Sequence, residues 1–186
     1  MNSTLPELIE TERLVIRVAR PEDAPSLHLA VRESIAELKP WLGWVSPPPT
    51  QDQSLASCKR AYARFLVNED LMVLLFLKSD GTLVGGSGLH SVNWDLRHFE
   101  VGYWGRTGYC GAGLITEAVR ALGEHALAEL GATRVYLTTD ERNGASWRLA
   151  ERAGFELEGV LRNERRDFTG TLRNTRVYSR IPRRDP

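Results

Sequence analysis

The feature that most constrains this chain is a glycine-rich turn between an expected strand and an expected helix. The strand covers residues 97–104, and the helix begins at Leu114. Gly108, Gly111 and Gly113 leave the turn without Cβ atoms at three places, so its backbone can press against a ligand and adopt positive φ. The first N–H groups of a helix lack internal partners, and the helix dipole adds partial positive charge there. The turn therefore predicts a site for a cofactor that carries a pyrophosphate.

Two common phosphate-binding patterns fit this turn less well. A P-loop ends in Gly-Lys-Ser/Thr, whereas Gly113 is followed by Leu114. The dinucleotide fingerprint fits better, because Gly111-x-Gly113-x-x-Thr116 keeps two of its three glycines and Asp140 ends the next expected strand. A dinucleotide fold places this unit early in the chain, however, and follows it with further parallel βα units. Here strands joined by turns precede it, so an oxidoreductase is the weaker alternative.

The turn and a second motif resemble those of the GNAT family of acetyl-CoA-dependent N-acetyltransferases. The family's cofactor loop, Gln/Arg-x-x-Gly-x-Gly/Ala, falls on residues 108–113, with Gly108 in place of the leading Gln or Arg. Residues 143–155 resemble the family's Asn-x-x-Ala/Ser followed by Gly-Phe. Three phrases resemble the RimJ/RimL-type branch: Trp41-Leu42-Gly43-Trp44, Glu100-Val101-Gly102-Tyr103-Trp104 and Thr116-Glu117-Ala118. The resemblance covers nearly the whole chain.

Composition narrows the class further. Lys+Arg and Asp+Glu both number 24, so no net field attracts nucleic acid or a membrane surface. Cys58 and Cys110 are too few for a disulfide framework. We find neither a signal peptide nor an apolar run long enough to span a membrane. We expect one GNAT domain over residues 1–186, a cytoplasmic enzyme with neither a membrane nor a metal partner; a homodimer is compatible with the sequence.

Hydrophobic periodicity predicts the elements. Strands are expected at residues 12–19, 71–78, 83–92, 97–104, 134–139, 155–162 and 173–181. Helices are expected at residues 21–38, 52–66, 114–130 and 146–154. A helix connects residues 97–104 to residues 134–139, so these two strands should be parallel. The resemblance implies an α/β fold with a mixed, mostly antiparallel sheet, helices on its faces and a V-shaped opening at this central parallel pair.

The resemblance also assigns residues to the co-substrate, acetyl-CoA. In the family the strand at residues 97–104 leaves main-chain N–H groups free for the pantetheine arm and the thioester carbonyl; Tyr103 and Trp104 match these positions, and Gly102 leaves room for the arm. Asn143 matches an asparagine that hydrogen-bonds the arm. The expected cofactor-binding set is Gly102, Tyr103, Trp104, Gly108, Tyr109, Cys110, Gly111, Ala112, Gly113, Leu114, Ile115, Asn143 and Ser146.

Glu100 is the candidate general base. Alternation places it on the same strand face as His98, Gly102 and Trp104. An attacking amine is mostly ammonium near neutral pH, so a carboxylate close to the thioester can take its proton. Many members of the family place a glutamate on this strand. The alternative is a solvated or salt-bridged glutamate, with water removing the proton.

Ser146 is the candidate for protonating the departing thiolate. Many relatives carry a tyrosine four residues beyond this position as the general acid, but this chain has Ala150. The proton donor is then Ser146 or water. The alternative interpretation is structural, because Asn143 and Ser146 are also the residue types that cap a helix N-terminus.

Aromatic and titratable side chains near the expected acceptor side are Trp41, Trp44, His90 and Glu100. The two tryptophans match a RimJ/RimL-type feature beside the substrate cleft, although large aromatic residues more often lie in a core. His90 is a second titrating candidate, with a structural role as the alternative. The C-terminal arginines could receive an anionic partner, but no aromatic-rich nucleic-acid motif accompanies them, so we expect a solvated face. They are Arg162, Arg165, Arg166, Arg173, Arg176, Arg180, Arg183 and Arg184.

The sequence thus predicts acetyl transfer from acetyl-CoA to a primary amine. The acceptor is the N-terminal amine of a protein or peptide, or a small-molecule amine. A thiolate at a helix N-terminus can be activated, so Cys110 offers a covalent alternative; the turn should hold the pyrophosphate far from the thioester, however, and we expect direct attack in a ternary complex. The competing functions are a non-catalytic CoA-binding protein and an RNA- or ribosome-associated protein.

Overall fold

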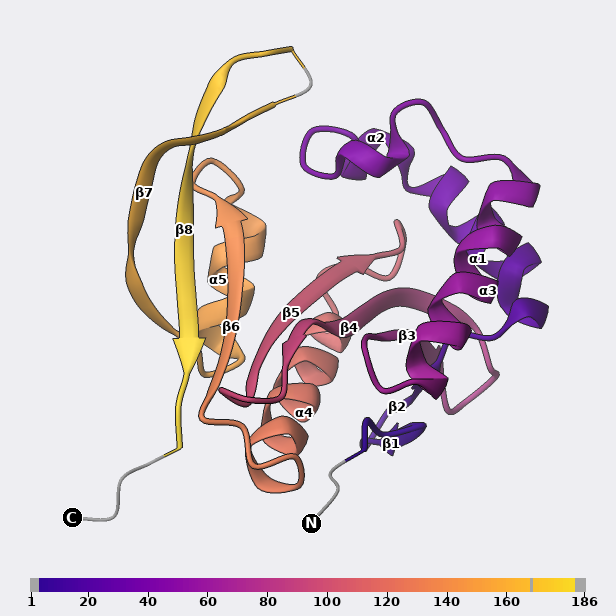
Figure 1. Ribbon diagram of the computed structural model, residues 1–186. Helices are drawn as coiled ribbons and strands as arrows, with labels where there is room; N and C mark the ends of the chain where they lie inside the picture. The colour runs from indigo at the N-terminus through magenta and orange to yellow at the C-terminus, as the bar shows by residue number, and fades with distance from the viewer. Residues whose placement is uncertain (1–3, 168, 183–186) are drawn as a thin grey trace.

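One mixed sheet of eight strands organises the molecule, in the order β1-β2-β3-β4-β5-β6-β8-β7 (Figure 1). The computed structural model describes residues 4–167 and 169–182. The strands are β1 (Leu8–Glu10), β2 (Leu14–Val18), β3 (Leu71–Leu77), β4 (Leu83–Asn93), β5 (His98–Gly105), β6 (Arg134–Asp140), β7 (Glu156–Arg166) and β8 (Leu172–Arg180). The helices are η1 (Pro21–Asp23), α1 (Ala24–Glu33), α2 (Ile35–Leu38), η2 (Gly43–Val45), α3 (Gln51–Leu66), α4 (Leu114–Ala128) and α5 (Gly144–Arg152).

The strand pairing confirms the predicted α/β class. Only β5 and β6 run parallel, and every other neighbouring pair in the sheet is antiparallel. The helix α4 makes the crossover between the two parallel strands, as such a connection requires. The sheet is therefore mixed and mostly antiparallel.

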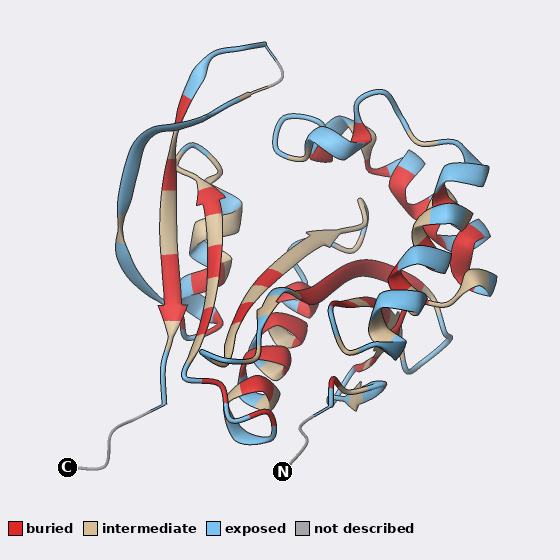
Figure 2. Ribbon diagram, in the orientation of Figure 1, coloured by how far each residue is buried: buried red, intermediate tan, exposed pale blue. Residues whose placement is uncertain are grey.

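Helices cover the two faces of the sheet unequally. On one face α4 and α5 bury the larger core, to which α4 contributes the apolar stripe expected from its periodicity; its members are Ile115, Ala118, Val119, Leu122 and Ala126. On the other face α1 and α3 pack over β3 and β4 and bury a smaller core. Along β6, residues alternate between buried and partly exposed. The second face of β5 and β6 is thus more open (Figure 2).

The opening lies where β5 and β6 separate. Register pairs join residues 98–100 of β5 to residues 134–136 of β6, and the described residues of the two strands pair no further. Beyond these three pairs the strands diverge (Figure 1). The backbone of the second half of β5 is consequently unpaired on this side, which is the V-shaped opening that the resemblance implied.

The predicted helix at residues 21–38 is wrong as a single element. Three short pieces replace it, and the break falls at Ser34. The Ser34 hydroxyl donates to the Ala30 carbonyl at 2.7 Å and accepts from the Thr107 N–H at 2.9 Å. A serine that hydrogen-bonds the preceding turn bends a helix. Here the bend also anchors the loop that follows β5.

Two edge strands differ from the prediction. The first, β1, was missed, because three residues are too few to show a period. The other edge strand, β7, continues to Arg166 rather than ending at Arg162, with register shifts between Leu157 and Gly159 and between Leu161 and Arg165. Nearly all of β7 is exposed (Figure 2), so no buried face marks its length in the sequence. Bulges of this kind are usual at sheet edges.

Candidate functional site

The direction of the β5 amides decides which groups face the opening. The Arg106 N–H donates to the Val84 carbonyl at 2.8 Å, in register with the pairing of β4 and β5. In an antiparallel pair, alternate residues turn their N–H and C=O groups toward the partner strand. Trp104 and Gly102 therefore face β4, and Tyr103 faces the opening. Of the two amides expected to be free, that of Tyr103 is available, and the expectation for the Trp104 amide is wrong because it belongs to the β4–β5 ladder.

The glycine-rich turn has the backbone that phosphate binding requires. Gly108, Gly111 and Gly113 adopt φ values of 90°, 87° and 79°. A Cβ built on Gly108 or Gly111 meets nothing within 4 Å, so open space lies against the turn. No side chain caps α4, whose N-cap is Gly113. Leu114 and Ile115 bury their side chains in the core, which leaves their N–H groups at the helix start to bind an anion.

Glu117 braces this turn from below. Its carboxylate accepts from Thr11 Oγ1 at 2.6 Å, from Arg13 N at 3.0 Å and from Arg13 Nε at 2.6 Å. Arg13 Nη1 in turn donates to the Ala112 carbonyl at 2.9 Å. Burial acts to raise the pKa of Glu117, but the hydrogen bonds from Thr11 and Arg13 outweigh it and lower the pKa. The turn is thus attached to the start of β2.

Ser146 and Tyr103 meet beside the opening. The Tyr103 hydroxyl lies 2.9 Å from Ser146 Oγ and 3.1 Å from the Ser146 carbonyl oxygen. Burial raises the pKa of Tyr103 to about 12, so this phenol stays protonated. Asn143 Oδ1 accepts from the Ser146 N–H at 3.1 Å and caps α5. The capping interpretation of Asn143 therefore applies to its oxygen, and its amide nitrogen remains for a ligand.

Glu100 lies on the open face of the sheet at the point where β5 leaves β6. Ser91 Oγ donates to Glu100 Oε2 at 3.0 Å, and Thr138 Oγ1 donates to Glu100 Oε1 at 3.3 Å. Burial raises the pKa of Tyr136, and the negative charge of Glu100 raises it further. The described residues form no salt bridge with this carboxylate. Hydroxyl groups orient it while its charge remains unneutralised, which argues against the salt-bridged alternative.

His90 lies beside Glu100 on the same face, because the two residues are register partners of β4 and β5. The His90 Nδ1 atom is 3.1 Å from both carboxylate oxygens of Asp70. Arg64 Nη1 approaches Asp70 at 3.5 Å. The site therefore contains a second titratable group that is held by a carboxylate.

The two tryptophans of the segment after α2 lie at the surface rather than in the core. Trp41 is 39% exposed and Trp44 is 51% exposed. Trp44 meets the Trp104 ring edge-on, with centroids 6.4 Å apart. The Arg173 guanidinium lies 5.9 Å from the centroid of Trp41, so this segment and β8 approach one another. The core alternative for Trp41 and Trp44 is wrong.

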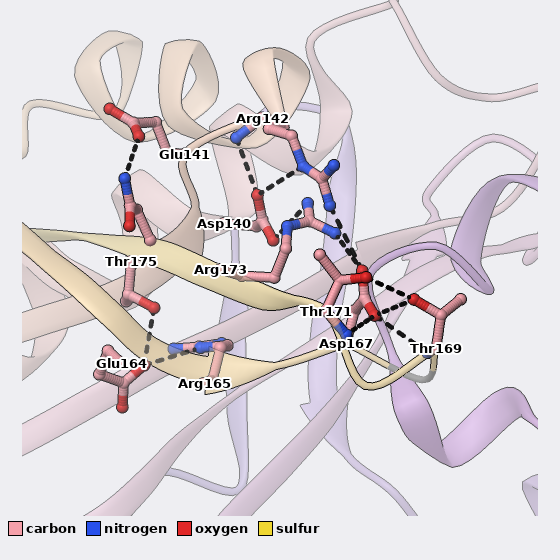
Figure 3. Close-up of polar contacts among 11 residues, drawn as sticks. Asp140, Glu141, Arg142, Glu164, Arg165, Asp167, Thr169, Thr171, Arg173 and Thr175 are labelled. Carbon is pink, nitrogen blue, oxygen red and sulfur yellow. Dashed lines mark hydrogen bonds and ion pairs between the residues drawn. The ribbon is translucent and has the colours of Figure 1, made fainter.

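Arg173 is the centre of a charged cluster at the end of the β7–β8 hairpin (Figure 3). Its Nη2 lies 2.6 Å from Asp140 Oδ2, and its Nη1 lies 2.9 Å from Asp167 Oδ2. Arg142 reaches the same Asp167 oxygen at 3.4 Å. Arg173 is only 7% exposed, so the two carboxylates balance a charge that water cannot solvate. The cluster joins the end of β6 to the hairpin.

Other arginines of the hairpin are also paired with carboxylates. Ion pairs join Arg165 to Glu164, Arg176 to Glu141 and Arg180 to Glu124. Arg183 and Arg184 lie outside the described residues. The pairing favours the solvated face expected from the sequence over a site for a polyanion.

A hollow of about 430 Å³ adjoins the Glu100 network. Ser91 lines it and donates to Glu100, and Arg64 lines it and pairs with Asp70. The other lining residues are Val67, Asn68, Glu69, Val92 and Trp94. The hollow combines apolar, aromatic and charged groups next to both titratable side chains, which suits the part of an acceptor that lies beyond its amine.

Cys110 is exposed in the glycine-rich turn and is a free thiol. Burial of its sulfur raises the pKa of this thiol, and the charge of Glu37 adds to the effect. A thiolate is thus disfavoured at this position. The structure gives no support to an acetyl-cysteine intermediate.

The family now follows from the sequence and the fold together. Residues 13–156 match the acetyltransferase (GNAT) domain family. The chain belongs to the GNAT acetyltransferase family. This GNAT enzyme transfers the acetyl group of acetyl-CoA to an amine, and its turn, with open space against positive-φ glycines and an uncapped helix, fits the pyrophosphate of that co-substrate.

Known proteins resemble the GNAT enzyme over most of its length. YdaF of Bacillus subtilis (strain 168), which is named as a ribosomal N-acetyltransferase, is 32% identical over 156 residues, 82% of each chain. The solved structure of RimL, a ribosomal L7/L12 alpha-N-protein acetyltransferase in complex with coenzyme A, has a TM-score of 0.87 at 23% identity and covers 94% of this chain and 98% of its own. The microcin C7 self-immunity acetyltransferase MccE, in complex with acetyl-CoA and AMP, has a TM-score of 0.87 at 19% identity, with coverages of 96% and 98%.

Several site residues of the GNAT enzyme were not found from the sequence. Asp70, Ser91 and Thr138 each contact a predicted site residue, but they lie 20, 9 and 38 positions from it along the chain. Only strand register brings them together, and the sequence carries no signal for register here. None of the helices in the described part of the chain is long and apolar enough to cross a membrane.

Proposed function

We propose that this GNAT enzyme acetylates the N-terminal amine of a protein or peptide, with ribosomal proteins as the acceptor class. The observation that carries the proposal is the placement of Glu100 one residue beyond the free half of β5 and beside the hollow. A peptide N-terminus has both a cationic amine for Glu100 and a following chain for the hollow. The name of YdaF, at 32% identity, supports the same acceptor class.

In the proposed reaction the chain positions the thioester and the amine within one ternary complex. The turn binds the pyrophosphate through backbone N–H groups, and the Asn143 amide binds the arm. The Tyr103 N–H lies at the opening, where it donates to the thioester carbonyl oxygen and stabilises the negative charge that develops on it. Positioning and this polarisation account for most of the catalysis.

Two residues move protons in this proposal. Glu100 takes the proton that the acceptor ammonium must lose before its lone pair can attack. Ser146 donates to the departing thiolate, with the Tyr103 hydroxyl at 2.9 Å to hold the Ser146 side chain in place. Trp41 and Trp44 form the exposed aromatic wall on the acceptor side.

An acceptor panel tests the proposal. Purified enzyme and acetyl-CoA would be offered short peptides that begin with Ser, Ala or Met, the same peptides with blocked N-termini, ribosomal proteins, polyamines and an aminoglycoside. We expect thiol release and a mass gain of one acetyl group only with free N-termini. Faster acetylation of polyamines or of lysine side chains than of any N-terminus would contradict the acceptor class.

A further inference from the structure

Acetyl transfer removes two protons from the acceptor nitrogen, and the inference below rests on the transfer proposed above. The ammonium loses one proton before it attacks. When the C–N bond has formed, the nitrogen is cationic again and loses a second proton as the C–S bond breaks and its electron pair leaves with sulfur. One proton ends on the thiolate and the other in solvent. Glu100 accounts for the first acceptor only, so a second group is required.

His90 is placed to be that group. It is the register partner of Glu100, so both side chains project from the same face of neighbouring strands. Its side chain is 36% exposed, whereas that of its partner Asp70 is 12% exposed. The imidazole is thus fixed at one end by a buried carboxylate and open at the other end to solvent, to which a proton can be returned.

Two glycines let the imidazole lie against the sheet. Gly88 and Gly102 are register partners, two residues from His90 and Glu100 on the same face. A Cβ on Gly88 would come within 2.6 Å of His90 Nε2, and a Cβ on Gly102 would come within 3.4 Å of it. Nε2 therefore lies over β5 beside Tyr103, whose amide faces the opening. A side chain at either glycine would displace the ring from this place.

The Asp70 carboxylate fixes which nitrogen can accept a proton. With both carboxylate oxygens 3.1 Å from Nδ1, the Nδ1 atom carries the hydrogen and donates it, which leaves a lone pair on Nε2. The charged groups that face this pair are Arg64, from α3, and Glu100, from β5. Arg64 holds Asp70, and the anionic Glu100 favours an imidazole that becomes cationic during the reaction.

We propose that His90 is a catalytic residue whose Nε2 accepts the second proton, from the nitrogen of the tetrahedral intermediate, and that Asp70 is its positioning residue. Glu100 and His90 thereby divide the two deprotonations between neighbouring strands. The His90 proton passes to solvent, and the thiolate receives its own proton from the Ser146 side.

The pH at which each variant is impaired separates the two proton acceptors. With a free N-terminal peptide as acceptor, the Glu100→Gln defect should shrink above about pH 8, where an α-amine is already neutral. The His90→Gln defect, expected at about 10²-fold in kcat, should persist at pH 9, because the second proton appears only after attack. A His90→Gln defect that disappears at pH 9, or an unchanged kcat, would overturn the proposal while leaving the N-terminal acceptor intact.

Chemical rescue separates catalysis from structure. His90→Ala leaves space over Gly88 and Gly102, so added imidazole should restore part of the activity, and it should restore none in Glu100→Gln. Asp70→Asn should lower kcat without raising the acetyl-CoA Kd, and should have no further effect in the His90→Ala background. His98→Gln, a histidine on the same face of β5, is the matched control and should keep wild-type activity. No rescue by imidazole, or a weaker acetyl-CoA affinity in His90→Ala, would show that His90 is structural.

Discussion

At the scale of single residues, Glu100 is a carboxylate held by hydroxyl groups and left without a counter-ion among the described residues. Glu100→Gln keeps the shape and the Ser91 and Thr138 contacts but removes the charge that takes a proton. Below the pKa of the amine we expect kcat/KM to fall by ~10²–10⁴-fold, with the acetyl-CoA Kd unchanged. Steady-state kinetics across pH and calorimetry measure the two quantities.

The control for that substitution is Glu156→Gln, an exposed glutamate at the start of β7. It should match the wild-type enzyme at every pH. If Glu100→Gln also matched the wild type at every pH, Glu100 would be structural. A loss confined to the KM of the amine would instead mean that Glu100 attracts the cation without removing its proton.

The glycine-rich turn gives a second prediction at this scale. Gly111→Val adds atoms where space is open and where φ is +87°, so it obstructs the pyrophosphate and strains the backbone by about 1–3 kcal/mol. We expect the acetyl-CoA Kd, measured by calorimetry, to rise by at least about tenfold. Gly81→Val is the matched control, because Gly81 also has open space and positive φ, at +73°, but lies in the β3–β4 turn. Equal affinities of the two variants would remove the turn from the cofactor site.

At the scale of elements, the contact between α4 and β2 depends on pH. The folded-state pKa of Glu117 is below its model value of 4.5, so its charge stabilises the fold fully above that pH and the stabilisation is lost as the pH falls through the folded value. Glu117→Gln should therefore lower the free energy of unfolding by about 1.5–3 kcal/mol at pH 7, and by less near pH 3.5. Denaturant titrations at both pH values measure this. A deficit of the same size at both would show that the charge of Glu117 contributes nothing.

Elements also show how far the sequence predicts this molecule. Strands with a buried face, such as β2, and the amphipathic α4 carry strong periods and were predicted. The break at Ser34 was not, because the bond that causes it comes from Thr107, far along the chain. For the site, motifs placed the turn, Glu100 and Ser146, whereas the pairing of His90 with Asp70 depends on packing and register. Local patterns predict elements, and tertiary contacts complete the site.

At the scale of the whole molecule, the sheet is two half-sheets joined by three residue pairs. A co-substrate in the opening contacts β5 and the turn on one side and α5 on the other. Acetyl-CoA at a hundred times its Kd should add ~2.7 kcal/mol to the free energy of unfolding. In hydrogen exchange, residues 101–105 and 108–117 should gain more protection than β1 and β2. Uniform protection across both regions would mean that the ligand does not lie in the opening.

The same joint has a consequence for the order of the chain. The strands β1 to β5 all precede residue 106, and β6 to β8 all follow residue 133, so the two half-sheets are also successive lengths of sequence. A nick in the connection after α4 would give one fragment with the glycine-rich turn and another with Ser146. Acetyl-CoA would touch both. Fragments expressed together should then reassemble in proportion to the co-substrate, and the severed enzyme would report the concentration of acetyl-CoA around it.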